Sequence, residues 1–209
     1  MKGMGKYFIG LLPPPALETT LYQLKSELKA HFQIKYALQS PSHLTLKMPF
    51  RYKEGKEREL VMRLTNLLEA QEPFPLQLLG IGHFGRRNIH HQIAASAPLI
   101  QLQILLRSFC KRYLHLIEEL SDRNFQPHIT LAYKDLKPNH FEEVLEFAHK
   151  NAVWDEFLVD KAYLMKIVEG RWKVIAPLDF GTGVENPIPT PKGEFFPANL
   201  SNDQTIYLN

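Results

Sequence analysis

Two pairs of residues in this chain have the types and spacing needed for chemistry. His43 is followed two positions later by Thr45, and His128 is followed in the same way by Thr130. In both runs an aliphatic residue separates the histidine from the threonine, and another follows the threonine. Since alternate side chains of a β-strand point to opposite faces, each run predicts a strand with histidine and threonine on one face. Together the two strands predict an active site that holds all four polar side chains.

This set of side chains fits a displacement at phosphorus. Histidine changes charge near neutral pH, so one ring can take a proton from the attacking oxygen while the other gives one to the leaving oxygen. A threonine hydroxyl can donate to a non-bridging phosphate oxygen, where donors fixed in advance contribute most. A single histidine in a strand is more often structural, but two copies in matching contexts are hard to reach by chance. Because the copies look alike, the sequence leaves open which histidine is the acid.

Composition limits the class of protein. The chain has 209 residues, of which 44% are hydrophobic and 22% charged, which is typical of a globular protein with one two-lobed domain or two small ones. The net charge of +3 suits an anionic substrate but is too small to indicate nucleic-acid binding by itself. The one cysteine, Cys110, excludes an internal disulfide and a cysteine-based zinc site. Without a long apolar run or a signal peptide, we expect a cytoplasmic protein that does not bind membranes.

The order of predicted elements repeats along the chain. Each histidine strand is preceded by a strand and a helix and followed by a helix and a hairpin. The two histidines are 85 residues apart, and so are Gly85 and Gly170 in the two hairpin turns. This spacing predicts a structural duplication that forms two lobes over residues 1–180, related by a pseudo-two-fold axis. The predicted strands span 7–12, 76–84, 89–95, 157–168 and 172–180, and the predicted helices span 17–32, 60–68, 102–120 and a segment opened by a capping box at 138–142.

The last segment of the chain differs in composition. Residues 181–209 are rich in proline, glycine and asparagine, which disfavours regular structure. We expect a surface extension there, with 205–208 as one possible edge strand.

The paired motifs resemble the two signature motifs of the 2H phosphoesterases, also called the 2′-5′ RNA ligase-like superfamily. The resemblance covers about residues 6–180 and includes Lys47 after the first motif and the segment 125–127 before the second. It departs from the family at Tyr133, where many bacterial members have arginine, and at 48–50, where an aromatic-aliphatic-glycine run is usual. The resemblance implies a bilobal α+β fold in which two antiparallel sheets line a central groove, with the helices outside.

The resemblance also implies an activity. Members act on 2′,3′-cyclic phosphates or 2′-5′ linkages of RNA and related nucleotides, using the two histidines without a metal or other cofactor. We therefore expect a monomeric phosphodiesterase that opens 2′,3′-cyclic phosphates of RNA or nucleotides and leaves a 2′-phosphate, with 2′-5′ RNA ligation as the reverse reaction. Two alternatives remain open. One is a phosphodiesterase for a small nucleotide, such as a cyclic phosphate of ADP-ribose or a 2′-5′ oligonucleotide. The other is a non-catalytic RNA-binding module on the same scaffold.

Four further residues are candidates for substrate binding. By strand alternation Lys47 continues the face of His43, and Lys134 continues the face of His128. Arg86 lies in a predicted turn from which it could reach an RNA backbone, and His90 lies on the polar side of a predicted strand. The neighbouring His91 falls on the apolar side, so the two adjacent histidines are not expected to share a metal ion. Other compact metal-ligand spacings are absent from the sequence, so we expect no metal site.

Overall fold

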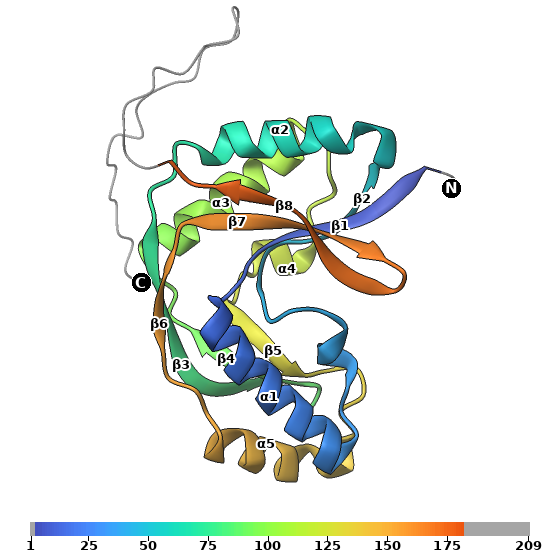
Figure 1. The fold of residues 1–209 in the computed structure, drawn as a ribbon, viewed down its shortest axis with the longest axis vertical. Coiled ribbons are helices and arrows are strands. Elements are labelled where there is room, and N and C mark those ends of the chain that lie inside the picture. Colours follow the sequence, from blue (N-terminus) through green and yellow to red (C-terminus); the bar gives the residue numbers. More distant parts are fainter. Residues whose placement is uncertain (1–2, 182–209) are drawn as a thin grey trace, which may run out of the picture.

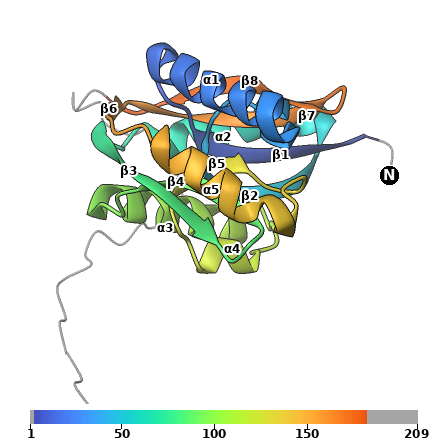
Figure 2. The ribbon, with the colours of Figure 1, turned by 90° about the horizontal axis from the view of Figure 1, so that it is seen from below.

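The computed structural model describes residues 3–181, which form an antiparallel sheet that curls strongly and carries its helices on the outside (Figures 1 and 2). Within this range the eight strands follow the order β6-β3-β4-β5-β2-β1-β7-β8. The strands are β1 (Met4–Leu11), β2 (Leu44–Lys53), β3 (Phe74–Phe84), β4 (Asn88–Ile93), β5 (His128–Ala132), β6 (Glu156–Val159), β7 (Lys161–Val168) and β8 (Arg171–Asp179). The α-helices are α1 (Pro15–Phe32), α2 (Glu57–Leu68), α3 (Ala97–Arg112), α4 (Leu120–Arg123) and α5 (Phe141–Lys150), and the 3₁₀ turns are η1 (Tyr36–Gln39), η2 (Glu54–Lys56) and η3 (Pro138–His140).

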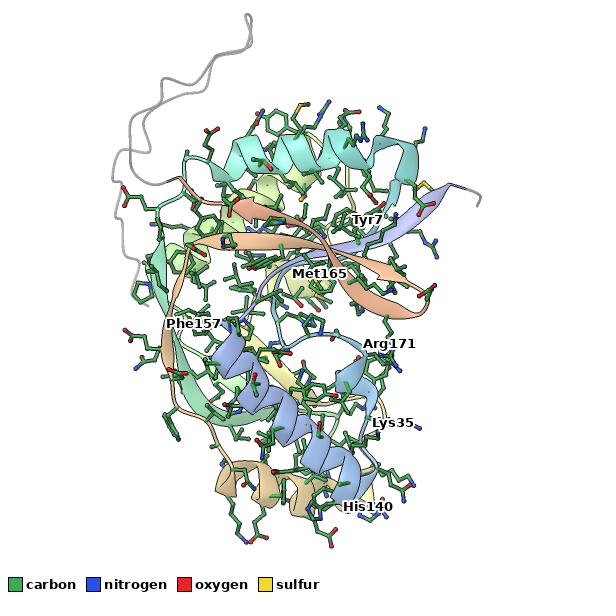
Figure 3. The ribbon with its side chains drawn as sticks, in the orientation of Figure 1. Tyr7, Lys35, His140, Phe157, Met165 and Arg171 are labelled. Atoms are coloured by element: carbon green, nitrogen blue, oxygen red, sulfur yellow. The ribbon has the colours of Figure 1, made fainter. Side chains whose placement is uncertain are left out.

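The sheet has two halves, and each forms one lobe. One lobe contains β2, β1, β7 and β8 with α2, α3 and α4, and the other contains β5, β4, β3 and β6 with α1 and α5. Figure 3 marks the first lobe by Tyr7 and Met165 and the far end of the second by His140. The α+β class is therefore confirmed. The two antiparallel sheets that we expected are the two halves of this one curled sheet, joined where Leu44 of β2 pairs with Ile129 of β5.

The lobes do not correspond to the two halves of the sequence. The hairpin of β7 and β8 pairs with β1, whereas the hairpin of β3 and β4 pairs with β5. Helix α1 likewise contacts β5, and α3 contacts β2. Each lobe is thus built from strands of both sequence halves. The pseudo-two-fold relation pairs β1 with β4, β2 with β5 and β3 with β7, so β4 begins the second repeat and does not end the first.

The helices form where the apolar spacing predicts them, and two buried clusters hold them on the sheet. Helix α1 starts at Pro15 in its first turn and buries Leu17, Leu21, Leu24 and Leu28. Leu24 and Leu28 of α1 belong to a buried cluster with α5 and the outer face of β4 and β5. Helices α2 and α3 pack on a larger buried cluster in the other lobe. These clusters fix the backs of the strands whose opposite faces carry the polar side chains.

Several predicted boundaries are wrong for identifiable reasons. The helix expected over 102–120 ends at Arg112, because the chain turns through His115, whose φ is 52°. The strand expected over 157–168 divides at Asp160, where the chain leaves β3 as its partner and joins β1. The capping box expected at the start of α5 does not form: His140 precedes the helix without a side-chain cap.

The extension at 182–209, with its expected edge strand at 205–208, lies outside the described residues. Among residues 3–181 no helix has the length and apolar character required to cross a membrane.

Candidate active site

The two His-x-Thr motifs lie side by side in antiparallel strands at the junction of the lobes. The bridge that joins β2 to β5 lies at the residue after His43 and the residue after His128. Continuing this antiparallel register places His43 beside Thr130 and Thr45 beside His128, all on one face. In such a pair, opposite Cβ atoms are about 4.5–5.5 Å apart and diagonal ones about 7–8 Å apart. His43 and His128 are diagonal neighbours in this register, so their Cβ atoms are expected to be about 7–8 Å apart. This separation suits two groups that act on opposite sides of one phosphate.

Both histidine rings are oriented by the same kind of hydrogen bond. His43 Nδ1 lies 2.8 Å from the carbonyl oxygen of Pro41, and His128 Nδ1 lies 2.7 Å from that of Gln126. Because a carbonyl only accepts, each Nδ1 carries a proton and donates it. The Nε2 atom of each neutral ring is therefore left with its lone pair and can act as a base, or as an acid once protonated.

Electrostatics keeps both rings neutral in the free protein. Burial lowers the pKa of His43 to about 4, against the opposing effect of the Pro41 carbonyl, and the charges of Lys25 and His128 lower it further. Burial also lowers the pKa of His128, again against its carbonyl partner. A bound phosphate would favour the protonated form of a nearby ring and so raise these pKa values.

Different side chains support the two rings. Phe8 packs against His43 with 4.6 Å between ring centroids, and Trp172 meets the edge of Phe8 at 4.7 Å. Phe8 belongs to β1 and Trp172 to β8, so this support comes entirely from the first lobe.

On the other side, His90 packs against His128 at 4.8 Å, and Phe84 contacts both rings, at 4.2 Å and 4.9 Å. His90 is only 3% exposed, and its Nδ1 lies 2.7 Å from Oδ1 of Asn88. Burial first, and the charge of His128 second, lower the pKa of His90 to about 3. His90 thus lies on the polar face beside a motif histidine, as its strand position predicts, and is a neutral neighbour of His128.

A pocket of about 140 Å³ opens beside His43 and Thr130. It is bounded by α1, η1, the end of β5 and the start of β8. The side chains that could face a ligand there are Lys25, Tyr36, Tyr133 and Trp172, together with the two motif residues. Tyr36 and Tyr133 meet edge to face with 6.1 Å between centroids.

Sequence reasoning missed three of these residues: Lys25, Tyr36 and Trp172. A signal existed for Lys25, because it lies on the leucine stripe of α1, four positions after Leu21 and next to Leu24, where a lysine is out of place. Tyr36 and Trp172 had no local signal, since their position depends on how the lobes meet.

Two carboxylates fix the walls of this pocket. Both oxygens of Glu18 accept from the backbone N–H of Ser42 at 3.0 Å, directly before His43. Oδ2 of Asp135 accepts from the N–H groups of Lys35 and Tyr36, each at 2.7 Å, at the start of η1. These bonds position the first motif and the Tyr36 ring.

The prediction that Lys47 shares the face of His43 is wrong. Gly10 of β1 pairs with Thr45, but the preceding Ile9 pairs with Lys47, so β2 carries one extra residue between them. This bulge reverses the alternation and turns Lys47 to the opposite face. There it is 2% exposed and lies 2.5 Å from Oδ2 of Asp122. Lys47 is a structural residue of the lobe and does not reach the groove.

Arg86 and Lys134 do not join the cluster around the histidines. Arg86 is paired with Glu142 at 2.8 Å, donates to the carbonyl of Pro138, and lies over the ring of Phe141, so it is bound to the start of α5. Lys134 is exposed, and its Nζ lies 4.7 Å from the centre of the Tyr36 ring, at the rim of the pocket. Because β5 carries an extra residue between Thr130 and Ala132, strand alternation does not place Lys134 on the face of His128, contrary to the prediction. Its contact with substrate stays a prediction.

His90 and His91 point to opposite faces, as expected, since His90 pairs with Thr130 and His91 with the buried Ile129. His91 is fully buried, as its place on the apolar side predicts. Its ring nitrogens have no hydrogen-bond partner by strict geometry among the described residues, but the backbone of Gly80 lies near enough to oppose the lowering of its pKa by burial. Over residues 3–181, no three His, Cys, Asp or Glu side chains gather in a way that could hold a metal ion.

Comparison with known proteins identifies the family. The model described as the 2'-5' RNA ligase superfamily matches residues 13–171. A Bacillus licheniformis protein named "putative phosphoesterase" is 27% identical over 172 residues, which cover 81% of this chain and 95% of that protein. Among solved structures, a Thermus thermophilus protein, TT0787, has a TM-score of 0.59 at 16% identity, covering 85% of this chain and 99% of that one.

The apo structure of E. coli LigT has a TM-score of 0.57 at 19% identity and covers 86% of this chain and 99% of that one. LigT has also been solved with phosphate and with 3'-AMP, at TM-scores of 0.55 and 0.53. At these identities the solved structures show a common fold. The family model spans most of the chain, including both motifs, and therefore shows that this chain belongs to the 2'-5' RNA ligase superfamily.

Proposed function

We propose that this protein is a metal-independent phosphodiesterase that opens 2′,3′-cyclic phosphates of RNA or nucleotides. The observation that carries the proposal is the pair of His-x-Thr motifs in adjacent antiparallel strands, with each Nδ1 bound to a carbonyl and each Nε2 left for substrate. The catalytic residues are His43, Thr45, His128 and Thr130. This assignment goes further than family membership, which supports a phosphoesterase in general.

The reaction follows from these groups. Nε2 of the neutral histidine takes a proton from water as the water oxygen bonds to phosphorus. The bond from phosphorus to one ribose oxygen breaks, and the protonated histidine gives its proton to that oxygen. The threonine hydroxyls donate to the non-bridging oxygens, whose negative charge grows in the transition state. With a 5′-hydroxyl in place of water as the nucleophile, the same base and acid would form a 2′-5′ linkage as the bond to the 3′ oxygen breaks.

The pocket supports a nucleotide substrate. Tyr36, Tyr133 and Trp172 offer aromatic surfaces beside His43, and bases stack on such rings with little sequence preference. LigT, which shares the fold, has been solved with phosphate and with 3'-AMP, so both kinds of ligand fit this architecture. By family resemblance the bond to the 3′ oxygen breaks and the product carries a 2′-phosphate.

The direct test is hydrolysis of a nucleoside 2′,3′-cyclic phosphate by purified protein in excess chelator. We expect turnover that the chelator does not reduce, and ³¹P NMR should show a single product, the 2′-phosphate. Absence of turnover on all four cyclic mononucleotides and on an RNA with a cyclic phosphate end would refute the proposal. Activity that requires added divalent metal would refute its metal-independent form.

The small net charge favours a second candidate within the same chemistry. A net charge of only +3 gives little general attraction for the many phosphates of a long RNA and suits a small nucleotide. A phosphodiesterase for a small nucleotide would give similar kcat/KM values for cyclic mononucleotides and for oligonucleotides with the same end. An RNA enzyme would prefer the oligonucleotide, and this preference would weaken as salt is added.

The dependence of activity on pH is a further prediction. The protein can catalyse the reaction only when one motif histidine is protonated and the other is neutral. In the free protein the pKa of each motif histidine lies below the usual 6.5, and that of His43 is about 4. Above both values the productive fraction falls as pH rises, so we expect kcat/KM to peak below pH 6.5. Because bound phosphate raises these pKa values, the alkaline limb of kcat should lie at higher pH than that of kcat/KM. A kcat/KM that rises from about pH 6 to about pH 8 would contradict this picture.

A further inference from the structure

Lys25 of α1 is a buried cation without a carboxylate partner. Its side chain is 2% exposed, and its recorded hydrogen bond is a long one of 3.5 Å from Nζ to the carbonyl of Ala37. Within residues 3–181 it forms no ion pair. The carboxylate of Glu18 attracts the Lys25 charge only at longer range, because both of its oxygens accept from the backbone N–H of Ser42. Burying a charge in this way costs free energy unless a partner is supplied.

The pocket shows where that partner would bind. Lys25 lines the same cavity of about 140 Å³ as His43 and Thr130, so an anion bound there would meet a cation, an imidazole and a hydroxyl at once. Burial lowers the pKa of Lys25 to about 8, which still leaves it protonated at neutral pH. The site therefore offers a charged donor for a phosphate oxygen.

Within residues 3–181, an unpaired cation of this kind is present on one side of the pseudo-two-fold axis only. The counterpart of α1 is α3, whose first residue, Ala97, follows that of α1, Pro15, by 82 positions, so Lys25 corresponds to Arg107. Arg107 is held within its own lobe, because its Nε lies 3.4 Å from Oε1 of Glu118 and its Nη1 donates to the carbonyl of Asp122. The ring of His128 has His90 and Phe84 as neighbours, and burial keeps His90 neutral as well.

We propose that Lys25 binds the substrate phosphate, and that its position beside His43 makes His43 the general base and His128 the general acid. This inference rests on the proposed function. A positive charge next to His43 opposes protonation of that ring, which holds it ready to accept a proton from water. His128 has no such neighbour, so it is the ring whose protonated form, with a proton taken from solvent, the negative charge of the bound phosphate stabilises. The charged or titratable groups facing His43 are Lys25 of α1 and His128 of β5, and those facing Lys25 are Glu18 and the two pocket phenols, Tyr36 and Tyr133.

Binding of inorganic phosphate tests the first half of the proposal without relying on activity. Trp172 lines the pocket, so Trp154→Phe leaves it as the only tryptophan and as a fluorescent reporter of occupancy. In that background we expect Lys25→Met to weaken phosphate binding by about 10- to 100-fold, the usual effect of losing a charged hydrogen bond. Lys29→Met, one turn later on the exposed side of the same helix, is the matched control and should bind as before.

The pH profile of kcat/KM on a cyclic nucleotide tests the second half. Removing the charge of Lys25 lets His43 protonate more easily, so in Lys25→Met the acid limb should move to higher pH, by the order of one unit. The alkaline limb, which His128 sets as the acid, should stay in place. Lys25→Gln should behave in the same way, and thermal unfolding should show that neither variant is less stable than wild type, because a lone buried charge has been removed.

The outcomes separate this proposal from the proposed function. If wild type turns over and Lys25→Met matches Lys29→Met in both assays, the proposal is overturned while the function stands. A shift of the alkaline limb instead would make His43 the acid and overturn the role assignment. If wild type hydrolyses no cyclic phosphate but Lys25→Met loses phosphate binding, the phosphate site stands and the function fails.

Discussion

His43→Ala and His128→Ala should each lower kcat for cyclic phosphate hydrolysis by about 10²- to 10⁴-fold, the range that a positioned acid or base contributes. Each variant removes an Nε2 that no neighbouring group replaces, since His90 is buried and holds its own Nδ1 against Asn88. The kcat of the double variant should be only slightly lower than that of the less active single variant, because the base and the acid act in the same step. The measurement is single-turnover hydrolysis of one cyclic nucleotide at a fixed pH.

The histidine variants need a control for folding. His149 lies on the exposed side of α5, in the outer layer of its lobe, so His149→Ala should keep full activity. All three variants should unfold at temperatures near that of wild type, since both motif rings are only half-buried. Wild-type kcat values in both motif variants would contradict the two-histidine mechanism. Unchanged nucleotide binding with no turnover in any form, wild type included, would instead point to the non-catalytic binding module.

The ion pair of Lys47 with Asp122 predicts the largest effect on stability. Asp122 accepts from Lys47 Nζ, from the N–H of Met48 at 2.8 Å and from that of Glu119 at 2.8 Å. Asp122→Asn leaves the Lys47 charge buried without a countercharge, and breaking a buried pair in this way costs about 3–5 kcal/mol. Urea denaturation should show this loss in the free energy of unfolding with little change in the m-value.

Rescue distinguishes this explanation from a general loss of packing. Adding Lys47→Met to Asp122→Asn removes the stranded charge, so at least half of the lost stability should return. Asp179→Asn, which breaks an exposed pair with Lys161, should cost less than about 1 kcal/mol. Where the Asp122→Asn protein is folded, its kcat should stay close to that of wild type, since Lys47 does not reach the groove. If Asp122→Asn instead lowered kcat without lowering the free energy of unfolding, Lys47 would have a role in substrate binding after all.

The parts of the site that could be predicted are those fixed by short-range pattern. Alternation over a few residues places His43 with Thr45 and His128 with Thr130, because the extra residue that β5 carries against β4 comes only after Thr130. The duplication was visible in the order of elements around the two motifs. The equal spacing of Gly85 and Gly170 did not indicate it, because the first turn joins β3 to β4 across the two repeats and the second joins β7 to β8. Helical spacing likewise located α1, α2 and α5 to within a few residues.

The parts that could not be predicted depend on tertiary contacts. Alternation fails at Lys47 because an extra residue in β2 is set by its pairing with β1, from which it is separated along the chain by the whole of α1. The division at Asp160 is invisible locally, because a run of apolar residues reads as one strand whether it has one partner or two. Lys25 is different: the lysine on an apolar stripe was visible, but only the pocket shows why it is there.

The exchanged strands have a consequence for how such a chain can arise and diverge. One repeat by itself holds no complete lobe, so it could build the site only as a symmetric pair of identical chains, with a strand of each inserted in the other. In such a homodimer the two histidines would have identical surroundings at every stage of evolution. Joining the repeats in one chain removes that constraint. It allows Lys25 and Phe8 to accumulate beside one ring and His90 and Phe84 beside the other, which is the difference that a paired acid and base require.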